Sequence, residues 1–328
     1  MVKIINNIED INHQMLKGVV KAYPHLNGIP NSGIIYQRNQ DPATVPIISG
    51  GGSGHEPAHF GFVGKGMLTA AISGPIFVPP SWKEILQTIQ LVHKGKGVFI
   101  IIKNFAEDLA EFSVAIKKAR AEGIPIKYVI AHDDISIETS NYQVRHRGVA
   151  GTVFLHKILG EAAKNGASLD ELEALALQLS TRIYTLGVAV SPASIPGNKK
   201  PLFELNENEI FYGIGIHGEP GYRKQPFISS EILANELINK LKMKFKWQEG
   251  DKFALMINNL GATPLMEQLV FFNDVMSLLK LDGLNIEYTM NGRYMTSLDM
   301  EGLSISLFAL EDPSWLNYLK AETEAFAW

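Results

Sequence analysis

Two histidines in this chain are framed by glycines and followed by the same dipeptide. Gly50-Gly51-Gly52-Ser53-Gly54-His55-Glu56-Pro57 lies near the start, and Gly213-Ile214-Gly215-Ile216-His217-Gly218-Glu219-Pro220 lies far downstream. Each motif follows a short apolar run typical of a strand, so we expect both imidazoles where a strand gives way to a loop. A neutral imidazole can add to an activated carbonyl, and histidine with its ordinary pKa of about 6.5 is largely neutral near pH 7. The two loops are therefore candidates for carbonyl chemistry.

The first loop also resembles a phosphate cradle, because successive glycines expose backbone N–H groups to an anion. It lacks the Gly-Lys-Ser/Thr ending of a P-loop and does not fit the Gly-x-Gly-x-x-Gly dinucleotide pattern. We therefore assign no nucleotide site to this chain. A tight turn that happens to contain His55 is the plain alternative, but two loops that both end in Glu-Pro favour a site.

A second candidate group follows the apolar run over 98–102. Lys103 ends this run, and Asp108 lies five residues later at the expected start of a helix. Polar residues beyond the carboxyl end of a parallel strand line the ligand crevice, so Lys103 and Asp108 could bind and deprotonate a hydroxyl. Asp108 could equally be a helix cap. Spacing alone supports the catalytic role and the helix cap equally.

The remaining histidines have weaker contexts. His59 and His132 stay ambiguous because both neighbour site loops. A metal held by His55, His59 and Glu56 is conceivable, but no helical His-x-x-x-His pair with an intervening Glu is present, so we expect no metal site. A surface, loop or core role is expected for the other five: His13, His25, His93, His146 and His156.

The composition narrows the class of protein. The 328 residues are 46% hydrophobic and 20% charged, which suits a soluble globular chain of about two domains. A net charge of −4, with Lys and Arg spread along the chain, gives no support for direct nucleic-acid binding. No cysteine is present, which excludes disulfides and thiolate chemistry. No leader is recognisable and no apolar run approaches the roughly 18 residues of a membrane span, so we expect a cytoplasmic protein without membrane contact.

Strand-like and helix-like segments alternate along the chain, which predicts an α/β protein with a largely parallel sheet covered by helices. Ser168 and Glu171 form a capping box for one helix. A Pro-, Ser- and Gly-rich stretch over 191–201 marks a connection, and we expect two α/β domains, 1–186 and 187–328. Strands are predicted over 34–36, 45–48, 98–102, 126–131, 210–216, 253–257, 284–290 and 303–310, and helices over 8–20, 82–93, 109–120, 149–165, 169–186, 230–245 and 264–279.

Five motifs in the same order resemble the dihydroxyacetone-binding subunit of dihydroxyacetone kinase, the DhaK family, and the resemblance covers essentially the whole chain. It implies the DhaK fold, two α/β domains with largely parallel or mixed sheets flanked by helices, and a homodimer. The motifs are Ser49 to Pro57, Ile101-Ile102-Lys103-Asn104, Gly213 to Pro220, Asn258-Asn259-Leu260-Gly261-Ala262-Thr263-Pro264 and Thr296-Ser297-Leu298-Asp299-Met300.

The resemblance also implies a division of roles. His217 would form a covalent hemiaminal with the carbonyl of dihydroxyacetone, His55 would act as acid and base in that step, and Asp108 would accept the proton of the phosphorylated hydroxyl. ATP, or a phosphoryl-carrying ADP, would sit with its magnesium on a separate helical partner subunit, so no cofactor is expected on this chain. The substrate hydroxyls would be bound by Gly52, Ser53, Gly54 and Lys103.

The chain departs from the family where phosphoryl transfer occurs. The family usually reads Lys-Asn-Tyr-x-Gly-Asp and then Asn-Phe, whereas this chain carries Glu107 and Glu111 beside Asp108. Like charges repel, so these carboxylates would oppose an incoming polyphosphate. A Gly-Arg-Arg-Gly element becomes Arg145-His146-Arg147-Gly148, and a Ser-Pro pair becomes Pro79-Pro80.

Three functions remain open. We favour a dihydroxyacetone-sensing co-activator, of the DhaQ kind, that acts through a partner transcriptional activator. The alternative is the working substrate subunit of the kinase, which retention of Asp108 supports. The third is a carrier for another small ketone or aldehyde. The balance leans against an enzyme because the substitutions cluster where a phosphoryl donor and its subunit would dock.

Overall fold

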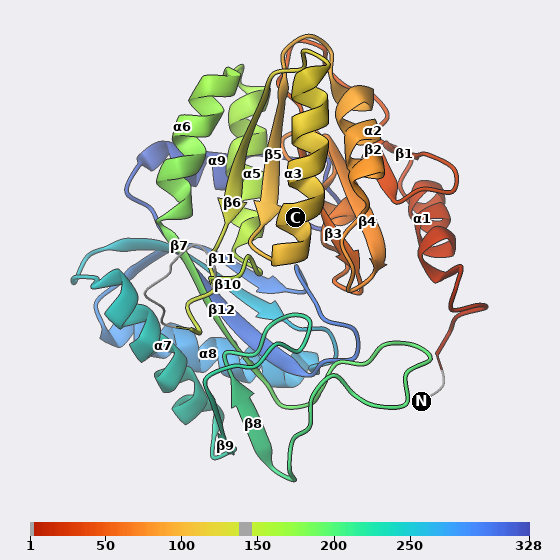
Figure 1. Cartoon of the computed structure of the whole chain (residues 1–328). Coiled ribbons are helices and arrows are strands. Elements are labelled where there is room, and N and C mark those ends of the chain that lie inside the picture. Colours follow the sequence, from red (N-terminus) through yellow and green to blue (C-terminus); the bar gives the residue numbers. More distant parts are fainter. Residues whose placement is uncertain (1–2, 138–145) are drawn as a thin grey trace. The chain divides into compact units, whose positions relative to one another are not determined.

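The structure, a computed structural model, describes residues 3–137 and 146–328. The chain forms two compact units, and each draws on separate stretches of sequence (Figure 1). Sequence analysis placed one boundary near Leu186, but the chain crosses between the units four times and Leu186 lies within a strand. The first unit comprises Met1–Ala131, Val153–Ser180 and Lys320–Trp328, and the second comprises His132–Thr152 and Thr181–Leu319.

Six strands in the described part of the first unit form its sheet, in the order β1-β2-β4-β3-β5-β6. From β4 to β6 the neighbours run parallel, and β1 and β2 join antiparallel at one edge. β5 is buried along its whole length, as expected for a parallel strand covered on both faces. The bounds are β1 (Leu26–Gly28), β2 (Ile34–Gln37), β3 (Ile47–Ser53), β4 (Ala70–Ile76), β5 (Val98–Lys103) and β6 (Ile126–Ala131).

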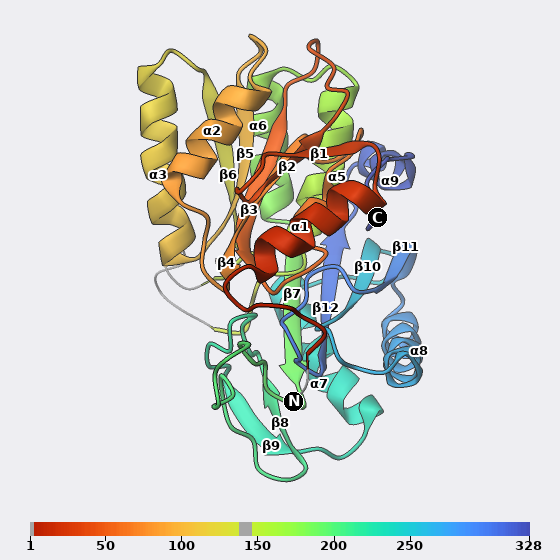
Figure 2. The ribbon, with the colours of Figure 1, turned by 90° about the vertical axis from the view of Figure 1, so that its right-hand side faces the viewer.

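Helices cover both faces of this sheet. Figure 2 shows α2 and α3 on one side and α5 and α6 on the other. The predicted capping box of Ser168 with Glu171 is formed at the start of α6, which confirms that prediction. A second capping box, Ser81 with Glu84, begins α2. The helices are α1 (Ile11–Ala22), a short 3-10 helix η1 (Phe60–Phe62), α2 (Trp82–Val92), α3 (Ala106–Ala121), α5 (Thr152–Lys164) and α6 (Leu169–Ser180).

The second unit has a mixed sheet in the order β11-β10-β12-β7-β8-β9, in which only the β10–β11 pair is parallel among the described strands. α7 and α8 pack together and cover an apolar core built on β7, β10 and β12. The bounds are β7 (Ile183–Ala189), β8 (Glu209–Tyr212), β9 (Arg223–Pro226), α7 (Ser230–Phe245), β10 (Lys252–Asn259), α8 (Leu265–Leu281), β11 (Asn285–Gly292), β12 (Gly302–Ala309) and α9 (Pro313–Lys320).

The predicted α/β class is confirmed, and one predicted element is wrong. The helix expected over 169–186 ends at Ser180, and Ile183–Ala189 forms β7 between β12 and β8. Ile183, Tyr184 and Val188 favour strands, and their side chains pack on the pleated surface of the sheet rather than continuing the helix. The predicted strand over 45–48 is also longer, because β3 continues through the glycines to Ser53.

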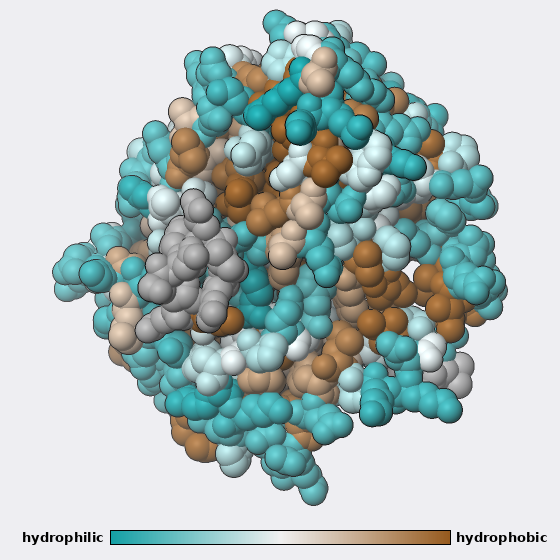
Figure 3. Space-filling view, in the orientation of Figure 1, coloured by the Kyte–Doolittle hydropathy of each residue, from teal (hydrophilic) through white to brown (hydrophobic). Residues whose placement is uncertain are grey.

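On the face drawn in Figure 3, hydrophobic residues gather in separate patches between hydrophilic ones. No helix within residues 3–137 and 146–328 is both long and apolar enough to cross a membrane.

Candidate functional site

The glycines of the first loop leave room for groups of the chain itself. A side chain at Gly52 would lie 2.6 Å from the backbone nitrogen of Val78, and one at Gly54 would lie 2.7 Å from the ring of Phe77. A side chain at Gly51 would overlap the Lys103 ammonium. The glycine run is therefore required by close packing of β3 against its neighbours, in addition to any approach of a ligand.

Ser53 is held by the N-terminal helix. Its hydroxyl lies 2.8 Å from Asn12 Oδ1 and 2.7 Å from the Gly74 carbonyl oxygen. Asn12 Nδ2 also donates to the carbonyl oxygens of Ser73 and Gly74, at 3.2 and 3.1 Å. This role of Asn12 was not predicted from the sequence. The available signal was a polar residue within the apolar face that Met15, Leu16 and Val19 give this helix.

His55 lies just after β3 and is buried. Its ring centroid is 5.0 Å from that of Phe77, whose φ of 57° is unusual for a residue other than glycine and marks a strained position. The Gly54 N–H donates to both carboxylate oxygens of Glu56, at 2.9 and 3.1 Å. Burial raises the pKa of Glu56 despite these hydrogen bonds. The Phe77 ring and the Gly54–Glu56 hydrogen bonds therefore hold the loop around the imidazole.

Lys103 and Asp108 form a buried ion pair. Lys103 ends β5, and its Nζ lies 3.3 Å from Asp108 Oδ1 on α3. The N-cap of α3 is Phe105, so Asp108 is a first-turn residue rather than the cap. A carboxylate in the first turn also suits the helix dipole. The structure thus brings together the two residues whose joint role spacing alone left open.

The second glycine loop folds back on its own glutamate. Glu219 Oε1 accepts from His217 Nδ1 at 2.9 Å, and Glu219 Oε2 accepts from the His217 backbone N–H at 3.0 Å. Burial alone would raise the pKa of Glu219, but the hydrogen bond and charge of His217 and the charge of Arg147 outweigh it and lower the pKa to about 2. The carboxylate therefore remains ionised and fixes the proton of His217 on Nδ1, which leaves the Nε2 lone pair free of that proton.

Arg147 holds this loop in place through hydrogen bonds and an ion pair. Its Nε donates to Asp134 Oδ2 at 2.6 Å, and its Nη2 donates to the Ser136 hydroxyl at 2.6 Å and to the Gly213 carbonyl at 2.8 Å. Its Nη1 lies 3.9 Å from Glu219 Oε2. Sequence analysis noted Arg147 only as part of an altered motif. Its partners are distant in sequence, so no local pattern reveals this role.

The altered motif also makes buried contacts. His146 lies in a loop, one of the two positions predicted for it, but it is buried, and its Nδ1 lies 2.9 Å from the Asp134 carbonyl oxygen. Burial lowers the pKa of His146. Arg145 lies outside the described residues. Asp134 is therefore joined to His146 and Arg147, and Ser136 to Arg147, by buried hydrogen bonds.

The predicted site residues fall in both units. The second unit carries His217. The first unit carries the others: Gly52, Ser53, Gly54, His55, Lys103 and Asp108.

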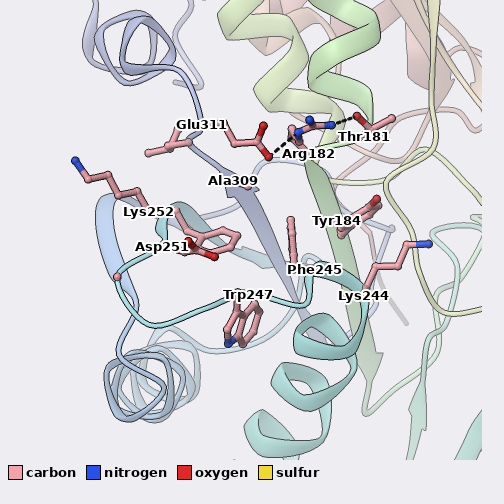
Figure 4. A pocket seen from close by; sticks show the side chains of 13 residues that line it. Thr181, Arg182, Tyr184, Lys244, Phe245, Trp247, Asp251, Lys252, Ala309 and Glu311 are labelled. Carbon is pink, nitrogen blue, oxygen red and sulfur yellow. Dashed lines mark hydrogen bonds and ion pairs between the residues drawn. The ribbon is translucent and has the colours of Figure 1, made fainter.

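A separate pocket of about 430 Å³ lies in the second unit, where β7 and β10 begin and β12 ends (Figure 4). Tyr184, Phe245 and Trp247 line it, and an ion pair of 2.8 Å between Arg182 and Glu311 borders it. No predicted site residue lines this pocket. Among residues 3–137 and 146–328, no three His, Asp or Glu side chains group closely enough to hold a metal ion.

These features define a two-unit α/β protein with a buried Lys–Asp pair and a glutamate-oriented histidine. Comparisons with known proteins identify its family. The Dak1 domain model matches residues 17–327. The DhaKLM operon coactivator DhaQ of Lactococcus lactis subsp. lactis (strain IL1403) is 54% identical over 99% of this chain and 100% of that protein. The dihydroxyacetone-binding subunit DhaK of the PTS-dependent dihydroxyacetone kinase from the same strain is 46% identical over 99% of this chain and 98% of that protein.

A solved structure described as the dihydroxyacetone kinase operon co-activator Dha-DhaQ superposes with a TM-score of 0.93 at 54% identity. It covers 98% of this chain and 99% of the other. The chain belongs to the DhaK-like family of Dak1-domain proteins.

Proposed function

We propose that this chain captures dihydroxyacetone covalently through His217 and acts as a dihydroxyacetone-sensing co-activator through a partner transcriptional activator. The observation that carries the proposal is the orientation of His217 by an ionised Glu219 that Arg147 in turn holds. The 54% identity with a DhaQ coactivator supports the regulatory role.

The proposed capture step conserves every atom. The Nε2 lone pair of His217 attacks the carbonyl carbon, the C–N bond forms, and the carbonyl π electrons move to oxygen. His55 supplies a proton to that oxygen, and the imidazolium loses its Nδ1 proton toward Glu219. Glu219 then releases that proton to solvent and His55 takes one up, so both groups return to their starting states. Glu219 Oε1 already accepts from Nδ1 at 2.9 Å and stabilises the positive charge that develops on the ring. The product is a neutral hemiaminal with the mass of one whole ligand added.

Lys103 and Asp108 are proposed to hold the ligand hydroxyls, together with Gly52, Ser53 and Gly54. Their buried pairing supplies both an ammonium donor and a carboxylate acceptor. Intact-mass spectrometry after native or reductive trapping tests the capture. Wild-type protein should gain one dihydroxyacetone and His217→Ala should gain none, whereas an adduct of equal yield on His217→Ala removes the covalent assignment.

The kinase subunit remains the second candidate because the Lys103–Asp108 pair is intact. The structure alters the charge argument against it. Glu111 Oε2 accepts from the Trp82 backbone N–H at 2.5 Å, so Glu111 serves the start of α2. Glu107 is exposed in the first turn of α3 beside Asp108. The repulsion of a phosphoryl donor therefore rests mainly on Glu107.

A further inference from the structure

Two histidines outside the proposed chemistry form a buried pair in the first unit. His59 precedes η1, and His156 lies on α5, with exposed fractions of 4% and 0%. His59 Nδ1 and His156 Nε2 are 2.9 Å apart, and the rings meet edge to face with centroids 5.1 Å apart. At this distance one of the two nitrogens must donate and the other must accept.

Both imidazoles are neutral. Burial, followed by the charges of Lys103, His156 and His55, lowers the pKa of His59 well below its usual value. Burial and then the charge of Lys103 lower the pKa of His156 to about 3. The pair therefore shares one N–H between the facing nitrogens, and its direction is set by the groups on the outer nitrogens.

Lys103 favours one direction. Its ammonium would overlap a side chain at Gly51, and His59 Nε2 lies 3.6 Å from where that side chain would begin, so both groups lie close to the same point of β3. An ammonium has three donors and no acceptor, which favours a lone pair over an N–H on the imidazole atom that faces it. With the lone pair on Nε2, His59 carries its proton on Nδ1 and donates it to His156 Nε2.

This arrangement leaves one buried N–H of His156 without a hydrogen-bond acceptor in the described part of the chain. His156 then carries its own proton on Nδ1, a buried atom that has no hydrogen-bond partner among the described residues. A buried donor without a partner is unfavourable, and such groups in native structures call for an explanation. The charge of Lys103 supplies one, because the opposite direction would turn an N–H toward an ammonium.

We propose that His59 and His156 are positioning residues: the acceptor nitrogen of His156, together with the charge of Lys103, fixes the tautomer of His59, and the Nε2 lone pair of His59 holds the Lys103 ammonium toward Asp108 and a ligand hydroxyl. The last point rests on the proposed function, in which Lys103 binds the ligand. The charged and titratable groups that face the pair are Lys103 from β5 and His55 from the loop after β3, with Asp108 of α3 paired to Lys103.

The first test needs no ligand. Long-range ¹H–¹⁵N correlation spectra of protein labelled on histidine nitrogens report which ring nitrogen carries the proton. We expect His59 and His156 to be Nδ1–H tautomers, with no protonation of either ring from about pH 8 to about pH 5. His156→Leu should release His59 toward the Nε2–H form, and His156→Gln should retain the Nδ1–H form. A wild-type His59 that is an Nε2–H tautomer, or that protonates in this range, overturns the proposal.

The second test follows adduct formation. Loss of an oriented hydrogen bond around a charged group should slow capture of dihydroxyacetone about tenfold in His156→Leu, with most of the rate restored in His156→Gln. His13→Leu, at an exposed histidine on α1, is the control and should not change the rate. Equal rates in wild type and in a folded His156→Leu overturn the positioning role. Absence of any wild-type adduct would instead overturn the proposed function and leave the tautomer result standing.

Discussion

The two glycine-framed loops look alike in sequence but differ in electrostatics. In both, a glutamate accepts from a backbone N–H two residues earlier, at Gly54 in one and at His217 in the other. Burial raises the pKa of Glu56, whereas the hydrogen bond of His217 and the charge of Arg147 overcome burial and lower that of Glu219. Carboxyl groups whose environments push their pKa values apart are suited to different roles. Glu219 is suited to be the ionised partner of the proposed nucleophile His217, and Glu56 is part of the loop structure.

Replacing the ionised partner tests this assignment. In Glu219→Gln the imidazolium that forms during attack loses its countercharge, and the amide can turn its NH₂ toward Nδ1 and favour the wrong tautomer. We expect the rate of adduct formation to fall by about 10²-fold or more, as for loss of comparable catalytic partners. A time course of intact mass measures the rate, and Glu207→Gln, at an exposed glutamate, is the control. An unaltered rate in Glu219→Gln would show that the carboxylate does not assist the attack.

The buried histidines predict acid sensitivity. His156 has a folded pKa of about 3, below the usual value of 6.5 that it regains on unfolding. A depressed histidine pKa contributes stability above the unfolded pKa, and this contribution is lost as the pH falls from 6.5 toward 3. The loss is about 1.4 kcal/mol for each pH unit below 6.5, or about 2 kcal/mol at about pH 5, and His59 adds in the same direction.

Two buried carboxyls, Asp133 and Glu56, act against this trend because burial raises the pKa of each. Burial raises the pKa of Asp133 to about 6, so its contribution to stability grows as the pH falls below 6. The lowered pKa values of four histidines outweigh the raised pKa values of the two carboxyls, and we expect urea denaturation to give a lower free energy of unfolding near pH 5 than near pH 7. The four are His59, His132, His146 and His156. Asp133→Asn should make the decrease steeper. A free energy that rises on acidification would contradict the histidine assignment.

At the scale of elements, the local sequence pattern was sufficient to predict most helices and strands of the fold. The apolar run before Lys103 and the periodic pattern over 230–245 predicted β5 and α7 closely. β4 was missed because its Ala-Ala-Ile-Ser-Gly-Pro sequence has little strand character, and β9 because its Arg-Lys-Gln-Pro sequence is polar. Both owe their conformation to pairing with neighbouring strands, which no short window contains.

The same limit applies to the candidate site. His217 and Glu219 are two residues apart, so both partners of this contact lie within the sequence motif. Asn12 reaches Ser53 across 41 residues, and His156 reaches His59 across 97. Arg147 reaches Gly213 across 66. These partners come together only through sheet order and helix packing, which the sequence pattern does not specify by residue.

Alanine substitutions at Gly54 and Gly95 distinguish the effect of backbone strain from the effect of packing in the first loop. Gly54 and Gly95 share a φ of +95°, which is unfavourable for alanine, but only Gly54 has the Phe77 ring 2.7 Å from where a side chain would begin. We expect Gly95→Ala to cost about 1 kcal/mol of stability and Gly54→Ala to cost about 1–3 kcal/mol more. Chemical denaturation measures both. Equal costs would mean that Phe77 moves away freely and does not fix the loop.

At the scale of the molecule, the proposed residues belong to two units, with His217 in one and His55, Lys103 and Asp108 in the other. A ligand that engages residues of both units gains binding free energy from each, so it favours whichever state of the protein offers both sets together. A partner that recognises that state must bind more tightly when the ligand is present, and the ligand must bind more tightly when the partner is present.

Ligand-dependent association is therefore expected for a sensor. With a transcriptional activator as partner, dihydroxyacetone should strengthen binding by about 5- to 150-fold, the usual range of coupling between two sites. Calorimetric titration with and without dihydroxyacetone measures the coupling, and His217→Ala should remove it. Equal affinity with and without ligand would exclude sensing by this route even if the covalent adduct forms.

The kinase alternative is decided by mixing this chain with a competent ATP-bearing helical subunit and dihydroxyacetone. We expect little or no turnover, although Lys103 and Asp108 are paired, because the exposed Glu107 adds negative charge where a polyphosphate would approach Asp108. Glu107→Gly removes that charge and restores the residue typical of the family, so it should raise turnover if repulsion is the cause. Glu111 is left unchanged in this experiment because its contact with the Trp82 N–H supports α2, and its loss would confound the result.

Wild-type turnover equal to that of a working kinase subunit would establish the enzyme alternative. Absent turnover that Glu107→Gly does not restore would move the cause to Pro79 or to His146, where the chain also departs from the family pattern.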